Sequence, residues 1–296
     1  MRISLRTTWV RPAAALASLL LLCGCGGLLT GDSETGRRNW AVVVGVASYD
    51  SPALDLKWAD EDALDFYDML RHGKNWEAEK ITLLTNGLAT KDAIKAALAG
   101  LARRVSADDQ VVFYFSGRGS YGPDQPPFDE GDGLDEYLLP YDAQPNSPVR
   151  DLSDDELEAL LSALPTNNVL IVIDAGFSGA PARSGVNGKE KSHARGSGRT
   201  TPRGLDGVGH DLARPGYILL TAGLAGEPVL ESTQLRNGVF THYLVEGLGG
   251  AANAGKKSVS AQQAFEFAAP RTSSFSAGQA PQAINNRGKD LKVVVF

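Results

Sequence analysis

Cysteine is almost absent from this chain of 296 residues. Its two cysteines are Cys23 and Cys25, and residues 26–296 contain none. Without a thiol, the body of the chain cannot hold a disulfide framework, a thiolate metal site or a cysteine nucleophile. The chain is 43% hydrophobic, which is enough apolar material to bury a core without such links.

Basic residues are also in deficit. The chain has 29 Lys and Arg against 35 Asp and Glu. Residues 1–24 contain three arginines and no acid, so residues 25–296 carry 26 basic and 35 acidic residues, a net charge of −9. A nucleic-acid-binding domain is expected to present a clustered basic face. We therefore expect no nucleic-acid partner.

The N-terminus has the pattern of a secretory signal peptide. Three arginines precede an apolar run over residues 13–22, which is followed by small residues. The run is shorter than the roughly 20 apolar residues that a membrane-spanning helix needs. We expect residues 1–24 to be a signal peptide, with residues 25–38 forming a small, polar and flexible tether.

The four residues Leu22-Cys23-Gly24-Cys25 resemble the lipobox of bacterial lipoproteins. This resemblance implies that Cys25 is acylated and becomes the first residue of the mature chain. Cys23 fits the pattern less well, and an ordinary cleaved signal is the alternative. Gly26 is not the aspartate that favours inner-membrane retention. We expect a secreted protein of the bacterial cell envelope, anchored by its N-terminal lipid to the outer membrane.

From residue 39 onward, buried-strand patterns alternate with helical periodicity. Apolar runs that indicate strands occupy residues 40–46, 81–84, 110–116, 168–174, 217–222 and 291–296. Amphipathic stretches that indicate helices occupy residues 58–70, 90–101, 153–164 and 239–248, and another begins near residue 260. This alternation predicts an α/β fold, a sandwich of helices around a mainly parallel sheet.

The composition changes abruptly over residues 180–204. This stretch holds six basic residues and one acid, Glu190, among many glycines and serines. Such a composition predicts a long exposed loop or a disordered linker. This stretch lies within a basic loop at residues 180–213. The loop divides the predicted domain, residues 39–296, into an N-terminal part at 39–179 and a C-terminal part at 214–296.

Two of the expected strands end in unusual sequences. Residues 115–119 read Phe-Ser-Gly-Arg-Gly, and residues 174–179 read Asp-Ala-Gly-Phe-Ser-Gly. In open α/β sheets, sites form beyond the carboxyl ends of the strands. The glycines in both segments allow sharp turns that expose one side chain and the neighbouring amides. These two segments are the candidate site.

The two segments resemble the Ser-Gly-His-Gly and Asp-x-Cys-x-Ser-Gly motifs of the caspase and metacaspase peptidase family. Further similarities follow in family order, at residues 43–49, 59–63, 136–140, 220–222, 238–241 and 278–282. The resemblance spans about residues 39 to 296. It implies a caspase-like α/β/α sandwich in which 39–179 corresponds to the large subunit and 214–296 to the small one.

The two positions that carry the family's chemistry differ in this chain. The histidine position holds Arg118, and the cysteine position holds Gly176. An arginine stays protonated and cannot act as a base, and a glycine has no side chain to attack a carbonyl. No part of the catalytic pair is intact. We therefore expect a pseudoenzyme, a lipid-anchored scaffold or a module that binds an unidentified protein or a basic peptide.

The resemblance also implies which residues of the site would bind a substrate. Backbone amides at Gly119 and Gly176 would form the oxyanion hole, and Asp62 and Asp174 would line a pocket for an arginine or lysine side chain. Two other interpretations remain: Asp174 caps its turn, and Asp62 is an ordinary acid in a first helical turn. Arg118 is also expected to compete for the pocket by pairing with Asp174.

A hydrolase with a relocated nucleophile is the alternative function. Ser178, two residues after Gly176, is the candidate, and it would need a partnered base. The four histidines are His72, His193, His210 and His242. Solvated or structural roles are more typical of such residues.

We expect no metal and no cofactor. Calcium is the alternative, because some metacaspases depend on it and an acidic stretch offers carboxylate oxygens. That stretch comprises Asp129, Glu130, Asp132, Asp135 and Glu136. We expect it to be a solvated loop.

Overall fold

The computed structural model describes residues 36–128, 133–177, 189–193 and 212–296. The chain separates into two units, residues 1–36 and residues 37–296, and the second unit contains the folded domain. The predicted signal peptide, most of the tether and Cys25 lie outside the described residues. None of the described helices combines the length and the apolar character needed to cross a membrane.

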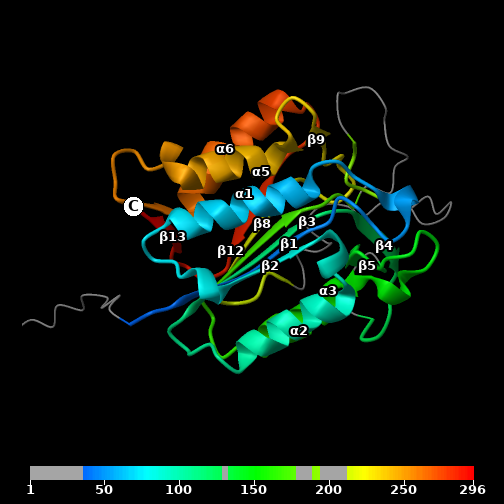
Figure 1. Cartoon of the computed structure of the whole chain (residues 1–296), viewed down its shortest axis with the longest axis horizontal. Coiled ribbons are helices and arrows are strands. Elements are labelled where there is room, and N and C mark those ends of the chain that lie inside the picture. Colours follow the sequence, from blue (N-terminus) through cyan, green and yellow to red (C-terminus); the bar gives the residue numbers. More distant parts are fainter. Residues whose placement is uncertain (1–35, 129–132, 178–188, 194–211) are drawn as a thin grey trace, which may run out of the picture. The chain divides into compact units, whose positions relative to one another are not determined.

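A six-stranded sheet forms the centre of the domain, in the order β12-β8-β7-β3-β1-β2 (Figure 1). Neighbouring strands from β8 to β2 are parallel, and only the edge strand β12 pairs in the antiparallel sense. The strands are β1 (Asn39–Gly45), β2 (Ile81–Thr85), β3 (Gln110–Ser116), β7 (Val169–Asp174), β8 (Tyr217–Thr221) and β12 (Gln282–Asn285). The four inner strands β1, β3, β7 and β8 are buried along their whole length, as parallel strands covered on both faces require, whereas the edge strands β2 and β12 are mostly half-buried.

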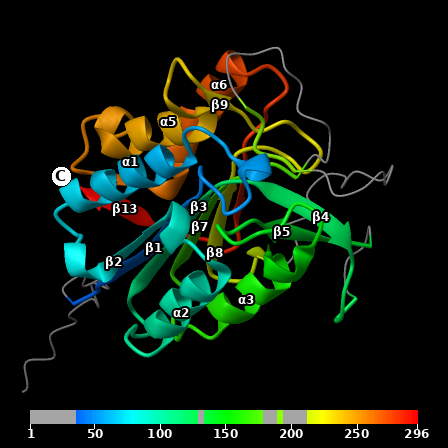
Figure 2. The same cartoon turned by 45° about the vertical axis from the view of Figure 1, so that its right-hand side comes forward.

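Helices cover both faces of this sheet, which confirms the predicted sandwich. On one face lie α1 (Ala59–His72), α5 (Val239–Glu246) and α6 (Ala261–Phe275), and on the other lie α2 (Lys91–Ala102) and α3 (Asp154–Ser162) (Figures 1 and 2). Thr90, Ser153 and Ser260 cap α2, α3 and α6, because each side chain accepts a backbone hydrogen bond at N3.

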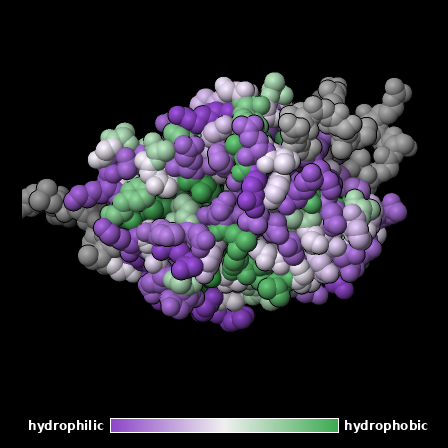
Figure 3. Space-filling model, turned by 45° about the horizontal axis from the view of Figure 1, so that its top comes forward, coloured by the Kyte–Doolittle hydropathy of each residue, from purple (hydrophilic) through white to green (hydrophobic). Residues whose placement is uncertain are grey.

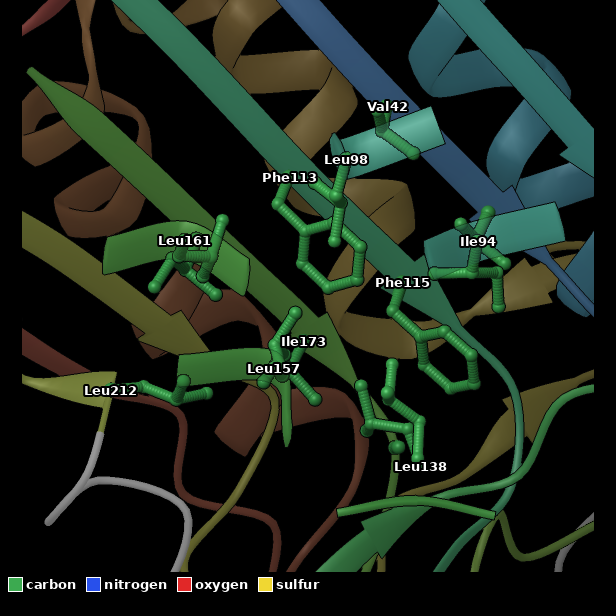
Figure 4. Close-up of a cluster of buried hydrophobic side chains, with 14 of the residues drawn as sticks. Val42, Ile94, Leu98, Phe113, Phe115, Leu138, Leu157, Leu161, Ile173 and Leu212 are labelled. Carbon is green, nitrogen blue, oxygen red and sulfur yellow. The ribbon is translucent and has the colours of Figure 1, made fainter. Parts of the chain in front are cut away.

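Two buried clusters hold the layers together. Alternate side chains of the strands point to opposite faces, so each strand contributes to both clusters. Phe113 and Ile173 lie with Leu98 and Leu161 of the helices on the α2 and α3 side (Figure 4). On the α1 and α5 side, the rings of Phe66 and Tyr114 stack with centroids 4.2 Å apart.

Several short elements were not predicted, although the strand expected at residues 291–296 is present and pairs with one of them. A three-stranded sheet joins β4 (Gly119–Pro123), β5 (Leu134–Leu138) and β6 (Leu152–Ser153), and two-stranded pairs join β9 (Glu231–Ser232) to β10 (Asn237–Gly238) and β11 (Ser258–Ser260) to β13 (Lys292–Val295). Single turns of 3-10 helix occupy Pro52–Leu54, Ala78–Lys80, Asn86–Leu88 and Pro148–Arg150, and a π turn occupies Gly247–Ala251.

The acidic stretch is therefore not a solvated loop throughout. Asp135 and Glu136 belong to β5 and are only 3% and 1% exposed. The prediction failed because β5 is paired on both edges, by β4 and by β6. Asp129, Glu130 and Asp132 lie outside the described residues. Elsewhere the surface mixes residue types, and hydrophobic side chains form separate patches among hydrophilic ones on the face in Figure 3.

Candidate functional site

The ends of β3 and β7 meet at one edge of the sheet. These strands are parallel neighbours, and Ser116 is paired with Asp174. The segments that follow approach so closely that a Cβ atom on Gly119 would lie 2.6 Å from the carbonyl oxygen of Gly176. A glycine is therefore required at position 119, and the two predicted amide donors lie side by side.

Both amides point at the same carbonyl oxygen, that of Lys191. Its distance is 2.9 Å from the nitrogen of Gly119 and 3.4 Å from the nitrogen of Gly176. Two amides directed at one carbonyl form the geometry of an oxyanion hole. Here the carbonyl belongs to the chain itself.

We call the space between β4 and residues 229–231, beyond the ends of β3 and β7, the cleft. A segment that includes Lys191, residues 189–193, lies in it. On one side it pairs with β4, where the amide of His193 donates to the carbonyl of Gly119 at 2.8 Å. On the other side the amide of Lys191 donates to the carbonyl of Val229 at 2.7 Å, and that of Glu231 donates to the carbonyl of Lys189 at 2.9 Å. The segment thus lies between two backbones as an added strand.

The prediction of an exposed linker is wrong for this segment. Lys191 is fully buried, and Glu190 and Ser192 are 3% and 6% exposed. The backbone hydrogen bonds and the buried ion pairs of the segment explain why it is ordered here. The rest of the basic stretch, residues 180–188 and 194–204, lies outside the described residues.

The side chain of Lys191 fills the predicted acidic pocket. Its ammonium Nζ lies 2.8 Å from Asp62 Oδ2 and 2.9 Å from Asp174 Oδ1. It also lies 2.8 Å from Ser116 Oγ, whose hydroxyl donates to Asp62. The side chains of Asp62, Asp174 and Lys191 are all fully buried. The structure therefore brings the two predicted aspartates together, around a lysine that the sequence did not single out.

The remaining carboxylate oxygens of this pocket are also hydrogen-bonded. Asp62 Oδ1 accepts from the amide of Gly238 at 2.7 Å. Asp174 Oδ2 accepts from both the amide and the hydroxyl of Thr241, at 3.1 and 2.6 Å. A Cβ atom on Gly238 would lie 2.5 Å from Lys191 Nζ, so a glycine is needed there to leave room for the ammonium.

The charges in the pocket perturb one another. Burial alone would lower the pKa of Lys191, but the carboxylates of Asp174 and Asp62 outweigh burial and raise it above its usual value. Burial raises the pKa of Asp174, opposed by the charge of Lys191 and reinforced by that of Asp62. The two carboxylates thus keep the lysine protonated, whereas burial makes Asp174 easier to protonate than an exposed carboxyl group.

Arg118 does not pair with Asp174, so that prediction is wrong. Its guanidinium instead donates to four backbone carbonyls, those of Leu54 at 2.5 Å, Glu190 at 3.1 Å, Ser192 at 2.7 Å and Asp55 at 3.3 Å. The physical reason is that Lys191 already occupies the space between the two aspartates. Burial lowers the pKa of Arg118, which is 9% exposed, yet an arginine in a protein remains protonated.

The space beside Gly176 is taken by Ser192. A Cβ atom on Gly176 would lie 2.5 Å from Ser192 Oγ and 3.3 Å from the Cβ of Val229. The hydroxyl of Ser192 donates to Glu190 Oε1 at 2.9 Å. Any side chain at position 176 would therefore require Ser192 to shift.

The three described histidines have their own contacts. His193 Nε2 lies 2.9 Å from the carbonyl oxygen of Pro145, and His72 Nδ1 lies 2.6 Å from that of Asp68. The ring of His242 packs edge-on against Tyr243 on α5. His210 and Ser178 lie outside the described residues. Within the described ranges, no group of three or more His, Cys, Asp and Glu side chains is placed to hold a metal ion.

A family model described as the caspase domain matches residues 38–290. The chain belongs to the caspase-domain family. Among the curated relatives of this chain is metacaspase-2 of Arabidopsis thaliana. It is 35% identical to this chain over 147 residues, which are 47% of this chain and 34% of the relative. Metacaspase-1 of Saccharomyces cerevisiae is 26% identical over 133 residues, 43% of this chain and 29% of the relative. The matches thus span about a third of the relatives' length.

Two solved structures share the fold. A protein from Geobacter sulfurreducens superposes with a TM-score of 0.62 at 20% identity, covering 88% of this chain and 99% of the other. Caspase-1 from Spodoptera frugiperda superposes with a TM-score of 0.54 at 14% identity, covering 88% and 90%. These similarities confirm the caspase-like α/β fold.

Proposed function

We propose that this protein is a non-catalytic member of the caspase family, a scaffold or binding module for a protein partner. The observation that carries the proposal is the placement of Arg118. At the position where the resemblance puts a histidine, a permanently charged guanidinium donates to four backbone carbonyls and has no lone pair with which to accept a proton. Gly176, at the cysteine position, offers no nucleophile.

The cleft itself supports the same proposal. The amides of Gly119 and Gly176 hold the carbonyl of Lys191, and Asp62 and Asp174 hold its ammonium. The features that would bind a substrate are therefore engaged by the chain itself. A basic peptide is a less suitable partner for this cleft than a protein that docks elsewhere on the domain.

A hydrolase with Ser178 as its nucleophile is the competing function. Labelling of the purified protein with a fluorophosphonate separates the two, because this reagent reacts with activated serines. We expect no labelling of the wild-type protein. Labelling that disappears in Ser178→Ala would overturn the non-catalytic proposal.

We further propose that the protein is held at the cell envelope by lipid on Cys25. The support is the sequence pattern around Cys23 and Cys25. Cys25→Ser is expected to move the protein from the membrane fraction to the soluble fraction, while the matched change Cys23→Ser leaves it on the membrane. The opposite result would assign the lipid to Cys23, and retention of both variants would contradict lipid anchoring.

A further inference from the structure

We propose that Arg118 and Gly176 form a receptor for the chain's own segment 189–193, so that the cleft holds a built-in ligand and is closed to external lysine peptides. The inference shares these two residues with the proposed function but goes beyond it. A chain can lack catalytic groups and still leave its cleft open. Here the same two residues that remove the chemistry make specific contacts that hold the cleft closed.

The first step of the argument is the position of the Arg118 contacts along the segment. Its Nη1 donates to the carbonyls of Glu190 and Ser192, the residues on either side of Lys191. Nε and Nη2 of the same side chain donate to the carbonyls of Leu54 and Asp55, in the chain that leads into α1. Arg118 therefore ties the segment to the body of the domain. An imidazole has two ring nitrogens and cannot make all four bonds.

The second step is the space at Gly176. Since a Cβ atom there would lie 2.5 Å from Ser192 Oγ, the Ser192 side chain can take its present position only because residue 176 has no side chain. The Ser192 hydroxyl is held in place by Glu190 of the same segment. Gly176 thus contributes to binding of the segment, because the absence of a side chain leaves space for Ser192.

The third step is that the segment engages all four residues predicted to bind a substrate, namely Gly119, Gly176, Asp62 and Asp174. Its backbone is paired on both sides, by Gly119 and by residues 229–231. Its lysine is fully buried between Asp62 and Asp174. An external peptide with a lysine would need the same amides and the same carboxylates. It would compete with a segment already linked to the chain, which has the advantage of an intramolecular contact.

Amine acetylation tests this closure directly. The intact protein is treated with N-hydroxysuccinimidyl acetate, and modification of each lysine is followed by mass spectrometry. Lys95, whose side chain is 40% exposed, is the internal reference. We expect Lys191 to react at least about ten-fold more slowly than Lys95, because its ammonium is buried and paired. Equal rates in the wild-type protein would overturn the proposal.

The role of Arg118 is tested by the same measurement on Arg118→Gln. We expect the protection of Lys191 to fall several-fold, while the matched surface change Arg150→Gln leaves it unaltered. Unchanged protection in a folded Arg118→Gln variant would contradict the assigned contacts. Arg150 is a suitable control because its partners, Asp92 and Asp142, lie outside the cleft.

A double-mutant cycle tests Gly176 even if Arg118→Gln does not fold. Gly176→Ala is expected to lower the melting temperature by several degrees, because its methyl group collides with Ser192. In a Ser192→Gly background the same change should lower it much less. Gly100→Ala, at a helical site with no atom within 4 Å of the new Cβ, is the control and should not lower it. Equal losses in both backgrounds would overturn the role of Gly176.

Failure of this inference and failure of the proposed function give different results. Free reactivity of Lys191 together with no hydrolysis would reject the built-in ligand and leave the non-catalytic function standing. Serine labelling together with a protected Lys191 would do the reverse.

Discussion

Lys191 neutralises two buried carboxylates, those of Asp62 and Asp174, by placing its ammonium between them. Lys191→Met keeps much of the volume but leaves Asp62 and Asp174 facing each other. Removing one partner of a buried ion pair destabilises a protein by about 3–5 kcal/mol. We expect a loss of that size in urea unfolding at neutral pH. Lys95→Met, which removes a half-exposed pair with Glu156, should cost less than about 1 kcal/mol. A loss at Lys191 no larger than this control would contradict the ion-pair description.

The penalty of Lys191→Met should depend on pH. Burial already raises the pKa of Asp174 in the folded protein above its ordinary 3.8, and loss of the ammonium raises it further. Between the ordinary pKa of 3.8 in the unfolded chain and the raised pKa of Asp174 in the folded variant, the folded state binds more protons than the unfolded state. The stability of the variant therefore falls as the pH rises through this range. Unfolding at pH 5 and pH 7.5 should therefore show a smaller penalty at pH 5. A penalty that grows on acidification would contradict this sign.

At the scale of elements, the sequence predicts what local patterns encode. The buried runs of β1, β3, β7 and β8 and the capped starts of α2, α3 and α6 lie within a residue or two of their predicted bounds. The short strands β4, β6 and β9 have no such pattern, because pairing with distant residues defines them. The same holds for segment 189–193, whose composition is that of a linker.

The cap of α6 offers an element-scale test. Ser260 and Gln263 form a reciprocal capping box, in which each side chain bonds the backbone amide of the other. Ser260→Ala should lower the free energy of unfolding by about 1 kcal/mol. Ser274→Ala, within the same helix, should change it little or raise it slightly. Indistinguishable effects of the two changes would argue against the capping box.

At the scale of the whole molecule, parallel topology made part of the site predictable. Gly119, Gly176, Asp62 and Asp174 were expected to converge, and they do so around Lys191. The identity of the pocket's occupant was not predictable, because six basic residues of one stretch were equal candidates and nothing local distinguishes Lys191. Arg118 was assigned to the wrong partner because nothing in the sequence shows that Lys191 fills the space between Asp62 and Asp174.

The placement of Lys191 predicts what a restored catalytic pair would cut. Arg118→His with Gly176→Cys would put a thiol beside a carbonyl that already faces two amides, and Ser192→Gly makes room for it. We expect this triple variant to cleave itself after Lys191, which intact-mass measurement detects as two fragments. The matched variant with Gly176→Ala should stay whole. A folded triple variant that stays whole while Lys191 remains protected from acetylation would contradict the alignment of Lys191 with the restored thiol.

The central claim, that the wild-type protein does not cleave peptides, is tested most directly by turnover. The purified protein is incubated, with and without calcium, with a peptide library that presents every residue type before a scissile bond, and products are read by mass spectrometry. We predict no product above the protein-free blank under either condition. Product that increases with protein concentration and is lost in Ser178→Ala would contradict the account.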